Sequence, residues 1–264
     1  MVDNIPHLYP LNPFSGAVVH LPHLWANCSP VFDEYLFKVV WSAKPTDPNF
    51  VIVFLKRDAY SAVYCRTGDA RWKLIHDSLE LSDAIFYKEK LYVVDDEEGC
   101  VAAVDLLHQD VVEEIRMPEL VAFARGSHLE RMYLAAGPSG LLFIVRQMKR
   151  SRYCSQGRNV KLQTGGFKVF ELDETTTKWN ETKSLGDGML FLGLNESMWL
   201  PSSNFKECKG NCIYFTDDSS YNIRRPILRE DSGIFHLEDG RFGSFYGDST
   251  KRLYPNPVWV VPHP

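Results

Sequence analysis

The sequence contains no long hydrophobic run, no secretory signal and no strong excess of charge of either sign. Its apolar runs fall well short of the ~20 residues needed to cross a bilayer. Residues 1–7 lack the basic start and apolar core of a signal peptide. A formal net charge of −5 over 264 residues disfavours a nucleic-acid surface as the main function. These absences predict a soluble protein of the cytoplasm or nucleus, with no membrane and no nucleic-acid partner.

Sequence patterns for catalysis, cofactors and metals are also missing. There is no G-x-S-x-G elbow, no G-x-G-x-x-G turn and no P-loop. His20 and His23 lie close together, but zinc needs four convergent ligands. Cys208 and Cys212 have no second pair nearby, so we expect reduced thiols, one in a loop and one in a buried strand. We therefore predict no enzyme activity, no cofactor and no metal site.

The sequence is rich in short apolar runs separated by turn residues. Hydrophobic residues make up 45% and aromatic residues 13% of the chain, and helical signals are confined to residues 118–125. Runs of about four to six apolar residues bounded by Gly, Asp and Ser are typical of buried strands. We expect two strands within 9–22 and single strands at 35–41, 50–55, 60–65, 71–75, 84–87, 91–94, 100–106, 111–115, 132–135, 141–146, 167–172, 178–182, 190–194, 212–215, 233–237 and 241–246.

These strands fall into four sets, near residues 35–75, 82–116, 131–182 and 189–246. The later strands of a set share an apolar strand, a turn and a basic residue followed by a large aromatic one, as at Trp72, Trp179 and Phe242. A repeat of roughly 40–50 residues is typical of propeller blades. We predict an all-β fold, a β-propeller of four-stranded antiparallel blades with about four and a half blades, incomplete at its N-terminal end. A β-sandwich is the alternative.

The predicted organisation is an N-terminal tail, residues 1–8, followed by one propeller domain, residues 9–264. The three repeated aromatic residues are expected to pack between blades. A strand at Val258–Val261 is expected to pair with residues 9–22 and to cover the exposed edge of the half-blade, since an open sheet edge favours aggregation.

A basic stretch between the strands at 141–146 and 167–172 is the best candidate for partner contact. Binding residues concentrate on loops held by rigid scaffolds, and a basic loop on an acidic protein suits an acidic partner. A solvated hairpin extension is the alternative interpretation. The candidate contact residues are Arg146, Lys149, Arg150, Arg152, Arg158 and Lys161.

An alternative function uses the central channel of the propeller. Propellers also host enzymes, so the fold alone does not decide the function. If Asp95, Asp217 and Asp218 gathered at one mouth of the channel, they could bind a small ligand or support hydrolysis. Carboxylates that converge would favour this hypothesis, and dispersed carboxylates would favour a non-catalytic interaction domain.

Four segments carry a resemblance to a known family: 11–17 (Leu-Asn-Pro-Phe-Ser-Gly-Ala), 186–197, 210–218 and 257–262 (Pro-Val-Trp-Val-Val-Pro). They resemble the plant KIB-type β-propeller family, also called domain of unknown function 295, found in F-box proteins of the SKIP-like group. The resemblance implies a plant protein whose propeller recognises a target protein.

In typical members of that family an N-terminal F-box binds the Skp subunit of a cullin-RING ubiquitin ligase. This sequence lacks the Leu-Pro-x-Glu-Leu type of motif that opens an F-box. We therefore expect target binding, the role of a ubiquitin-ligase substrate receptor in full-length relatives, without Skp binding by this stretch.

Overall fold

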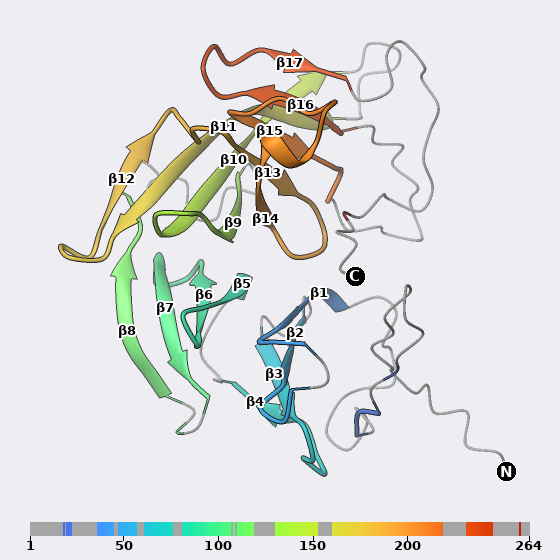
Figure 1. Ribbon diagram of the computed structural model, residues 1–264, viewed down its shortest axis with the longest axis vertical. Coiled ribbons are helices and arrows are strands. Elements are labelled where there is room, and N and C mark those ends of the chain that lie inside the picture. The colour runs from blue at the N-terminus through green and yellow to red at the C-terminus, as the bar shows by residue number, and fades with distance from the viewer. Residues whose placement is uncertain are drawn as a thin grey trace, which may run out of the picture.

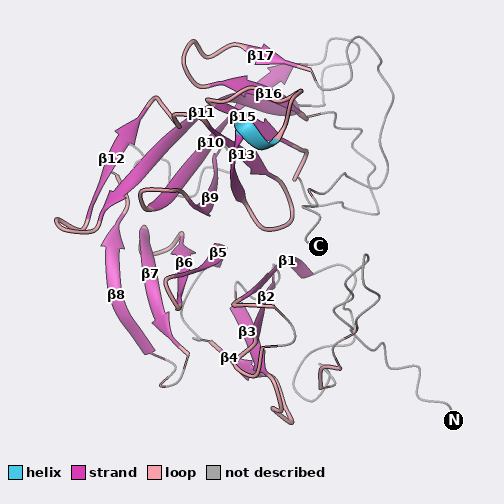
Figure 2. Cartoon of the chain, viewed as in Figure 1, coloured by secondary structure: helices cyan, strands magenta, loops and turns pink. Residues whose placement is uncertain are grey.

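The computed structural model describes residues 18, 20–22, 36–44, 47–56, 61–75, 81–106, 108, 110–118, 130–152, 160–218, 231–244 and 259. These residues fold almost wholly into β-strands, together with the short 3-10 helix η2 (Ser202–Asn204) (Figure 2). The strands form four sheets that follow one another around an arc (Figure 1). The all-β propeller prediction is confirmed. The predicted half-blade at 9–22 and the possible helix at 118–125 lie largely outside the described residues.

The first three sheets are antiparallel meanders in which neighbours in sequence are neighbours in space. The first contains β1 (Leu36–Trp41), β2 (Val51–Lys56), β3 (Ser61–Arg66) and β4 (Lys73–Leu74). The second contains β5 (Leu81–Tyr87), β6 (Lys90–Asp95), β7 (Cys100–Asp105) and β8 (Asp110–Arg116). The third contains β9 (Glu130–Ala136), β10 (Leu141–Arg152), β11 (Val160–Asp173) and β12 (Lys178–Thr182).

The fourth sheet departs from the predicted four antiparallel strands. It contains β13 (Gly188–Leu192), β14 (Met198–Pro201), β15 (Cys212–Phe215), β16 (Gly233–His236) and β17 (Phe242–Gly243), in the order β14-β13-β15-β16-β17. The strand β14 was not predicted. The last residue of β14, Pro201, lies opposite Gly188, the first residue of β13. The chain has thus returned to the beginning of β13, and β15 runs parallel to that strand. The predicted neighbourhood of 190–194 and 212–215 is confirmed.

The second and third sheets each divide their side chains between the sheets on either side. In β10, Leu141, Phe143 and Val145 pack towards the second sheet, while Leu142 and Ile144 pack towards the fourth. Successive side chains of a strand point to opposite faces. Because both faces are buried, these strands read as continuous apolar runs instead of alternating ones. Each such buried side chain contributes about 1.5–3 kcal/mol of hydrophobic stabilisation.

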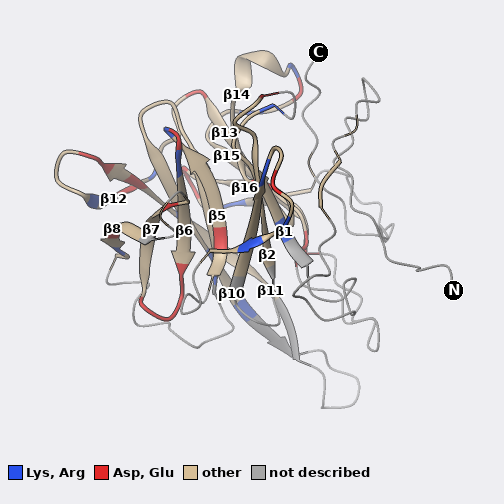
Figure 3. Ribbon diagram, turned by 90° about the horizontal axis from the view of Figure 1, so that it is seen from below, with Lys and Arg blue, Asp and Glu red and all other residues tan. Residues whose placement is uncertain are grey.

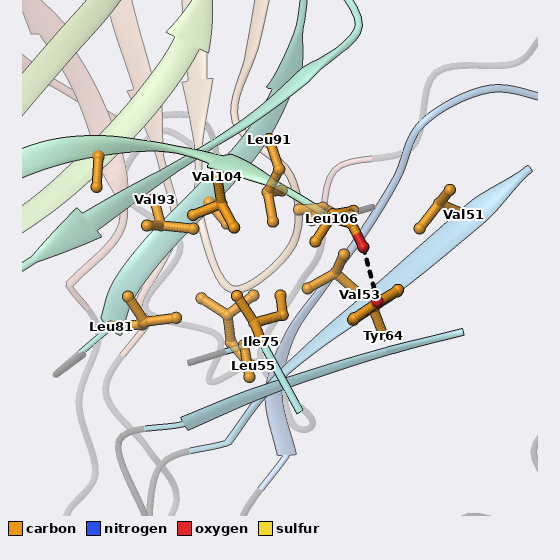
Figure 4. Close-up of a cluster of buried hydrophobic side chains, with 14 of the residues drawn as sticks. Val51, Val53, Leu55, Tyr64, Ile75, Leu81, Leu91, Val93, Val104 and Leu106 are labelled. Carbon is orange, nitrogen blue, oxygen red and sulfur yellow. Dashed lines mark hydrogen bonds between the residues drawn. The ribbon is translucent and has the colours of Figure 1, made fainter. Parts of the chain in front are cut away.

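The core between the first two sheets illustrates this packing (Figure 4). Val53 and Leu55 of β2 meet Leu91 and Val93 of β6 in one buried cluster. The buried hydroxyl group of Tyr64 donates a hydrogen bond to the backbone carbonyl of the second sheet's Leu106, with 2.8 Å between the oxygens. Together these contacts hold the two neighbouring blades side by side.

The three repeated aromatic residues behave differently from one another. Trp179 packs on Phe143, with ring centroids 5.5 Å apart, in the core between the second and third sheets, as predicted. Trp72 packs at a tilt against Phe54, on the face of the first sheet turned away from the second sheet, and Leu21 packs on the same face. Phe242 is 48% exposed and contacts Phe215 and Phe235 of its own sheet. For Trp72 and Phe242 the inter-blade packing stays a prediction.

The two faces at the ends of the arc are covered by residues near the chain ends. Leu21 packs against the outer face of the first sheet, and the indole of Trp72 donates to the carbonyl of Pro22. Trp259 packs against the outer face of the fourth sheet. The predicted pairing of 9–22 with 258–261 involves residues that are mostly outside the described part. Within the described part, no helix has the length and apolar character required to cross a membrane.

Candidate functional site

The basic residues predicted to contact a partner belong to the two longest strands of the third sheet. β10 and β11 stay paired as far as Arg152 opposite Val160. In contrast, β9 stops pairing with β10 at Gln147, and β12 pairs with β11 only from Val169 onward. Residues 148–152 and 160–164 therefore form a two-stranded extension of the sheet, which we call the ribbon. The hairpin-extension alternative describes this region correctly, since most of the predicted loop is strand.

Lys149 is the ribbon residue whose side chain best fits a contact role. Its side chain is exposed, and its aliphatic stem lies over Gly165, where a Cβ atom would overlap it. The absence of a side chain at Gly165 thus lets the lysine lie along the ribbon. The other predicted contact residues apart from Arg146 are placed as follows: Arg150, Arg152 and Lys161 in the paired strands, and Arg158 outside the described residues. Their contact with a partner stays a prediction.

Arg146 is a correction to the sequence analysis. It lies within β10, its side chain is fully buried, and it contacts the fourth sheet instead of solvent. Its guanidinium group donates to carboxylates of Asp218 at 3.0 Å and Asp231 at 2.9 Å. It also donates to the hydroxyl of Thr164 and to the backbone carbonyls of Thr216 and Asp231. All five donors are used, so Arg146 cannot contact a partner.

Further polar groups complete this buried cluster. Tyr133 of β9 donates a short hydrogen bond to the carboxylate of Asp218, and Arg131 approaches the same carboxylate at 3.4 Å. The backbone N–H of Thr164 donates to Asp231 at 3.0 Å. Two arginines thus face two aspartates. The arrangement fixes the chain before β16 and after β15 against the base of the ribbon.

Electrostatics in the cluster favour the ionised forms of Asp218 and Arg146. Burial alone would raise the pKa of Asp218, but the charges of Arg146 and Arg131 outweigh it and hold that pKa below its usual value. Burial would lower the pKa of Arg146, yet the negative groups around it raise that pKa instead. Burial and the neighbouring Asp218 raise the pKa of Tyr133, which keeps its hydroxyl a donor.

A second polar cluster lies where the first strands of the first three sheets meet. Lys38 of β1 and Asp83 of β5 form a buried ion pair. The two strands are the first strands of their sheets and lie next to each other (Figure 3). Asp83 also accepts the backbone N–H of Leu134 in β9, at 2.7 Å, and that of its neighbour Ala84. Glu196, in the turn between β13 and β14, is electrostatically coupled to both charged residues. We call Lys38, Asp83 and Glu196 the axial cluster.

Burial raises the pKa of both carboxylates of the axial cluster. Burial raises the pKa of Asp83, and the opposing charge of Lys38 only partly offsets it. Burial likewise raises the pKa of Glu196, with Lys38 opposing and Asp83 adding to the shift. Sequence reasoning missed this cluster. A charged residue inside an apolar run, as at Lys38 and Asp83, is the signal that could have found it.

Of the three carboxylates named for the channel alternative, Asp95 and Asp218 have separate roles. Asp95 accepts hydrogen bonds from the backbone N–H groups of Glu97 and Glu98 and so caps its own turn. Asp218 belongs to the Arg146 cluster. Among the described residues, no group of three or more His, Cys, Asp or Glu side chains is placed to hold a metal ion. Cys212 is buried in β15 and Cys208 is partly exposed, as predicted, and both are free thiols.

Comparison with known proteins points to one family. The sequence profile of the KIB1-4 β-propeller family matches residues 1–236. A putative F-box protein of Arabidopsis thaliana is 29% identical over 176 residues, a match that covers 66% of this chain and 44% of the relative. An F-box protein of the same plant is 25% identical over 211 residues, covering 75% and 60% of the two chains. Another putative F-box protein is 21% identical over 191 residues, covering 72% and 47%. The chain spans about half the length of the curated relatives it matches.

Proposed function

The chain belongs to the KIB1-4 β-propeller family, and from this premise we propose that it is a non-catalytic domain that recognises a target protein through the ribbon. The relatives are named as F-box proteins. The proposed role is therefore that of the target-recognition propeller in a ubiquitin-ligase substrate receptor. Skp binding is not part of the proposal for this stretch.

The observation that carries the proposal is the shape and charge of the ribbon. It extends past both neighbouring strands and carries Lys149, Arg150, Arg152 and Lys161 on a chain whose net charge is −5. The Arg146 cluster anchors its base to the fourth sheet. A basic extension anchored at its base suits an acidic partner surface, because opposite charges accelerate encounter and select against wrong partners. Such contacts weaken as salt screens the charges.

The compartment proposed for this activity is the cytoplasm or nucleus. The described thiols of Cys65, Cys100, Cys208 and Cys212 are all free. Free thiols are the usual state in a reducing compartment, where disulfides rarely persist.

The test is affinity purification from plant cells followed by mass spectrometry. The wild-type chain is compared with a ribbon variant, K149E/R150E/R152E, and with a control of the same charge change at exposed positions off the ribbon, K178E/K183E/K206E. We expect a partner that the wild type and the control retain, that the ribbon variant loses, and that high salt elutes. Equal recovery by all three chains would overturn the ribbon proposal.

A fourth chain carries a relative's F-box grafted onto the N-terminus. We expect Skp and cullin to co-purify with the graft alone, while the partner of the wild type is retained. Skp recovered with the ungrafted chain would contradict the expectation that this stretch does not bind it. No partner with any chain would count against target recognition itself.

A further inference from the structure

We propose that Phe191, Leu192 and Asn195 of the fourth sheet form a binding site for an extended peptide segment carrying a tryptophan, and that the chain's own Trp259 occupies this site as an internal competitor. The inference does not depend on the ribbon. It rests on the contacts of Trp259, which lie 64 to 67 residues away in sequence from the groups they bind.

The backbone of Trp259 is bound on both sides by one side chain. The amide nitrogen of Asn195 donates to the carbonyl oxygen of Trp259 at 2.6 Å. The backbone N–H of Trp259 donates to the amide oxygen of Asn195 at 3.2 Å. A side-chain amide carries both a donor and an acceptor, so it can replace the edge of a neighbouring strand. These two hydrogen bonds involve only backbone groups of Trp259, so they could form with any extended peptide.

The side chain of Trp259 supplies the selectivity. Its indole N–H donates to the backbone carbonyl of Leu192 at 2.9 Å, which also accepts the N–H of Thr216 at 3.0 Å. The indole ring lies edge-on to Phe191, with centroids 4.9 Å apart. A half-buried tryptophan is stabilised when its N–H finds a partner, and this site provides both the partner and an aromatic wall.

The surroundings of the indole ring are closely packed. Gly193 follows Leu192, and a Cβ atom there would press against the hydroxyl of Thr216 and would lie in ordinary contact with Cδ1 of Trp259, at 3.5 Å. Phe191 itself is stacked on Tyr214, with centroids 5.0 Å apart, within a buried cluster that includes Met189 and Cys212. The aromatic wall is therefore fixed by the core of the sheet before any ligand binds.

The ligand class follows from these contacts. An extended segment needs only one tryptophan to make the same two backbone bonds, the indole bond and the edge-on ring contact. A tethered segment has an effective concentration on the order of millimolar, so a free peptide competes poorly with Trp259 in the intact chain. Weakening the internal contact should therefore raise the apparent affinity for a free peptide.

The experiment measures binding of a fluorescent peptide with the sequence of residues 255–264, Pro-Asn-Pro-Val-Trp-Val-Val-Pro-His-Pro, to full-length chains by anisotropy. We expect W259A to bind it about tenfold more tightly than the wild type. W259F, which keeps an aromatic ring but loses the indole donor, should lie between them. Adding Asn195→Ala to either variant should reverse the gain, and a peptide with alanine in place of tryptophan should bind weakly.

A tryptophan with a purely structural role would not produce this pattern. Equal affinity of the wild type, W259F and W259A for the peptide would overturn the proposal. So would unchanged binding after Asn195→Ala, or equally tight binding of the alanine peptide. If W259A fails to fold, the affinities of the wild type and W259F for the peptide are compared instead. W259F removes only the indole hydrogen bond and keeps an aromatic ring against Phe191, and equal affinities would overturn the proposal.

Discussion

The guanidinium group of Arg146 binds the carboxylate of Asp231, which lies 85 residues later in the chain, with 2.9 Å between Nη2 and Oδ2. Arg146 is fully buried and Asp231 nearly so; Arg146 lies in the third sheet, and Asp231 lies two residues before β16 of the fourth. Such a pair contributes modestly as a whole, because the cost of desolvating both charges offsets their attraction. Losing only one partner is costly, because the other charge is then buried and unpaired.

The first prediction concerns Arg146→Met. We expect the free energy of unfolding to fall by about 3–5 kcal/mol, since Asp218 and Asp231 would be left without their buried cation. Urea denaturation followed by fluorescence measures it. Arg241→Met is the matched control, because Arg241 is 80% exposed and pairs with Asp239 at the surface; its loss should be at most about 1 kcal/mol. Equal losses would show that the cluster does not stabilise the sheet interface.

The second prediction concerns the pH dependence of Glu196. Its raised pKa means that the folded state binds a proton more tightly than the unfolded state. The resulting stabilisation is complete below the unfolded pKa of about 4.3 and is lost as pH rises through the higher folded pKa. Glu196→Gln imitates the protonated form, so its stability relative to the wild type should increase between pH ~4.5 and ~7.5.

Chemical denaturation across that pH range measures the effect, with Glu238→Gln at an exposed position as the control. Asp218 acts in the opposite direction, because its pKa is lowered. Its contribution is present above the unfolded pKa and is lost as pH falls through the folded value. A constant difference between Glu196→Gln and the wild type at every pH would contradict the proposed coupling within the axial cluster.

Strand positions were predictable because their signal is local. Buried runs such as 141–145 are apolar throughout and are bounded by turn residues, whatever the rest of the chain does. The strand β14 was missed because its four residues are only partly buried and end at Pro201. The parallel pairing of β13 with β15 depends on where β14 ends, so the residues of β13 and β15 alone do not predict it.

The candidate site was less predictable, for a physical reason. A basic residue at the end of an apolar run, such as Arg146, looks like the start of a loop. Its burial is decided by Asp218 and Asp231, 72 and 85 residues away. Lys38 and Asp83 are similar, since each is tolerated in an apolar strand only because the other is there. Pairs of this kind are invisible without the fold.

The third prediction concerns the turn between β5 and β6. Lys88 and Glu89 both have positive φ, at 47° and 65°, and connect the paired residues Tyr87 and Lys90. A two-residue hairpin of this type favours Asn and Gly, because other side chains are strained there. Glu89→Gly should therefore stabilise the protein by about 0.5–1 kcal/mol.

Glu89 is the better position to change, because Lys88 pairs with Glu174 of the third sheet at 2.6 Å. Thermal unfolding should register a higher Tm for Glu89→Gly. As a control, Glu89→Ala removes the same carboxylate without relieving the backbone, so it should give no gain. A Tm that rises equally in both variants would attribute the effect to charge instead of strain.

The last prediction concerns Gly188 at the start of β13. A Cβ atom there would overlap the indole ring of Trp199 in the neighbouring β14, and the rigid ring cannot move aside as a flexible chain end could. Gly188→Ala should lower the free energy of unfolding by about 1–3 kcal/mol through this overpacking. Gly166→Ala is the matched control, because the nearest atom to its Cβ would be 3.8 Å away. Adding Trp199→Leu should recover part of the loss, since the smaller side chain leaves room for the methyl group. Additive effects of Gly188→Ala and Trp199→Leu in urea denaturation would contradict the contact as the cause, because a shared clash must give a coupling energy.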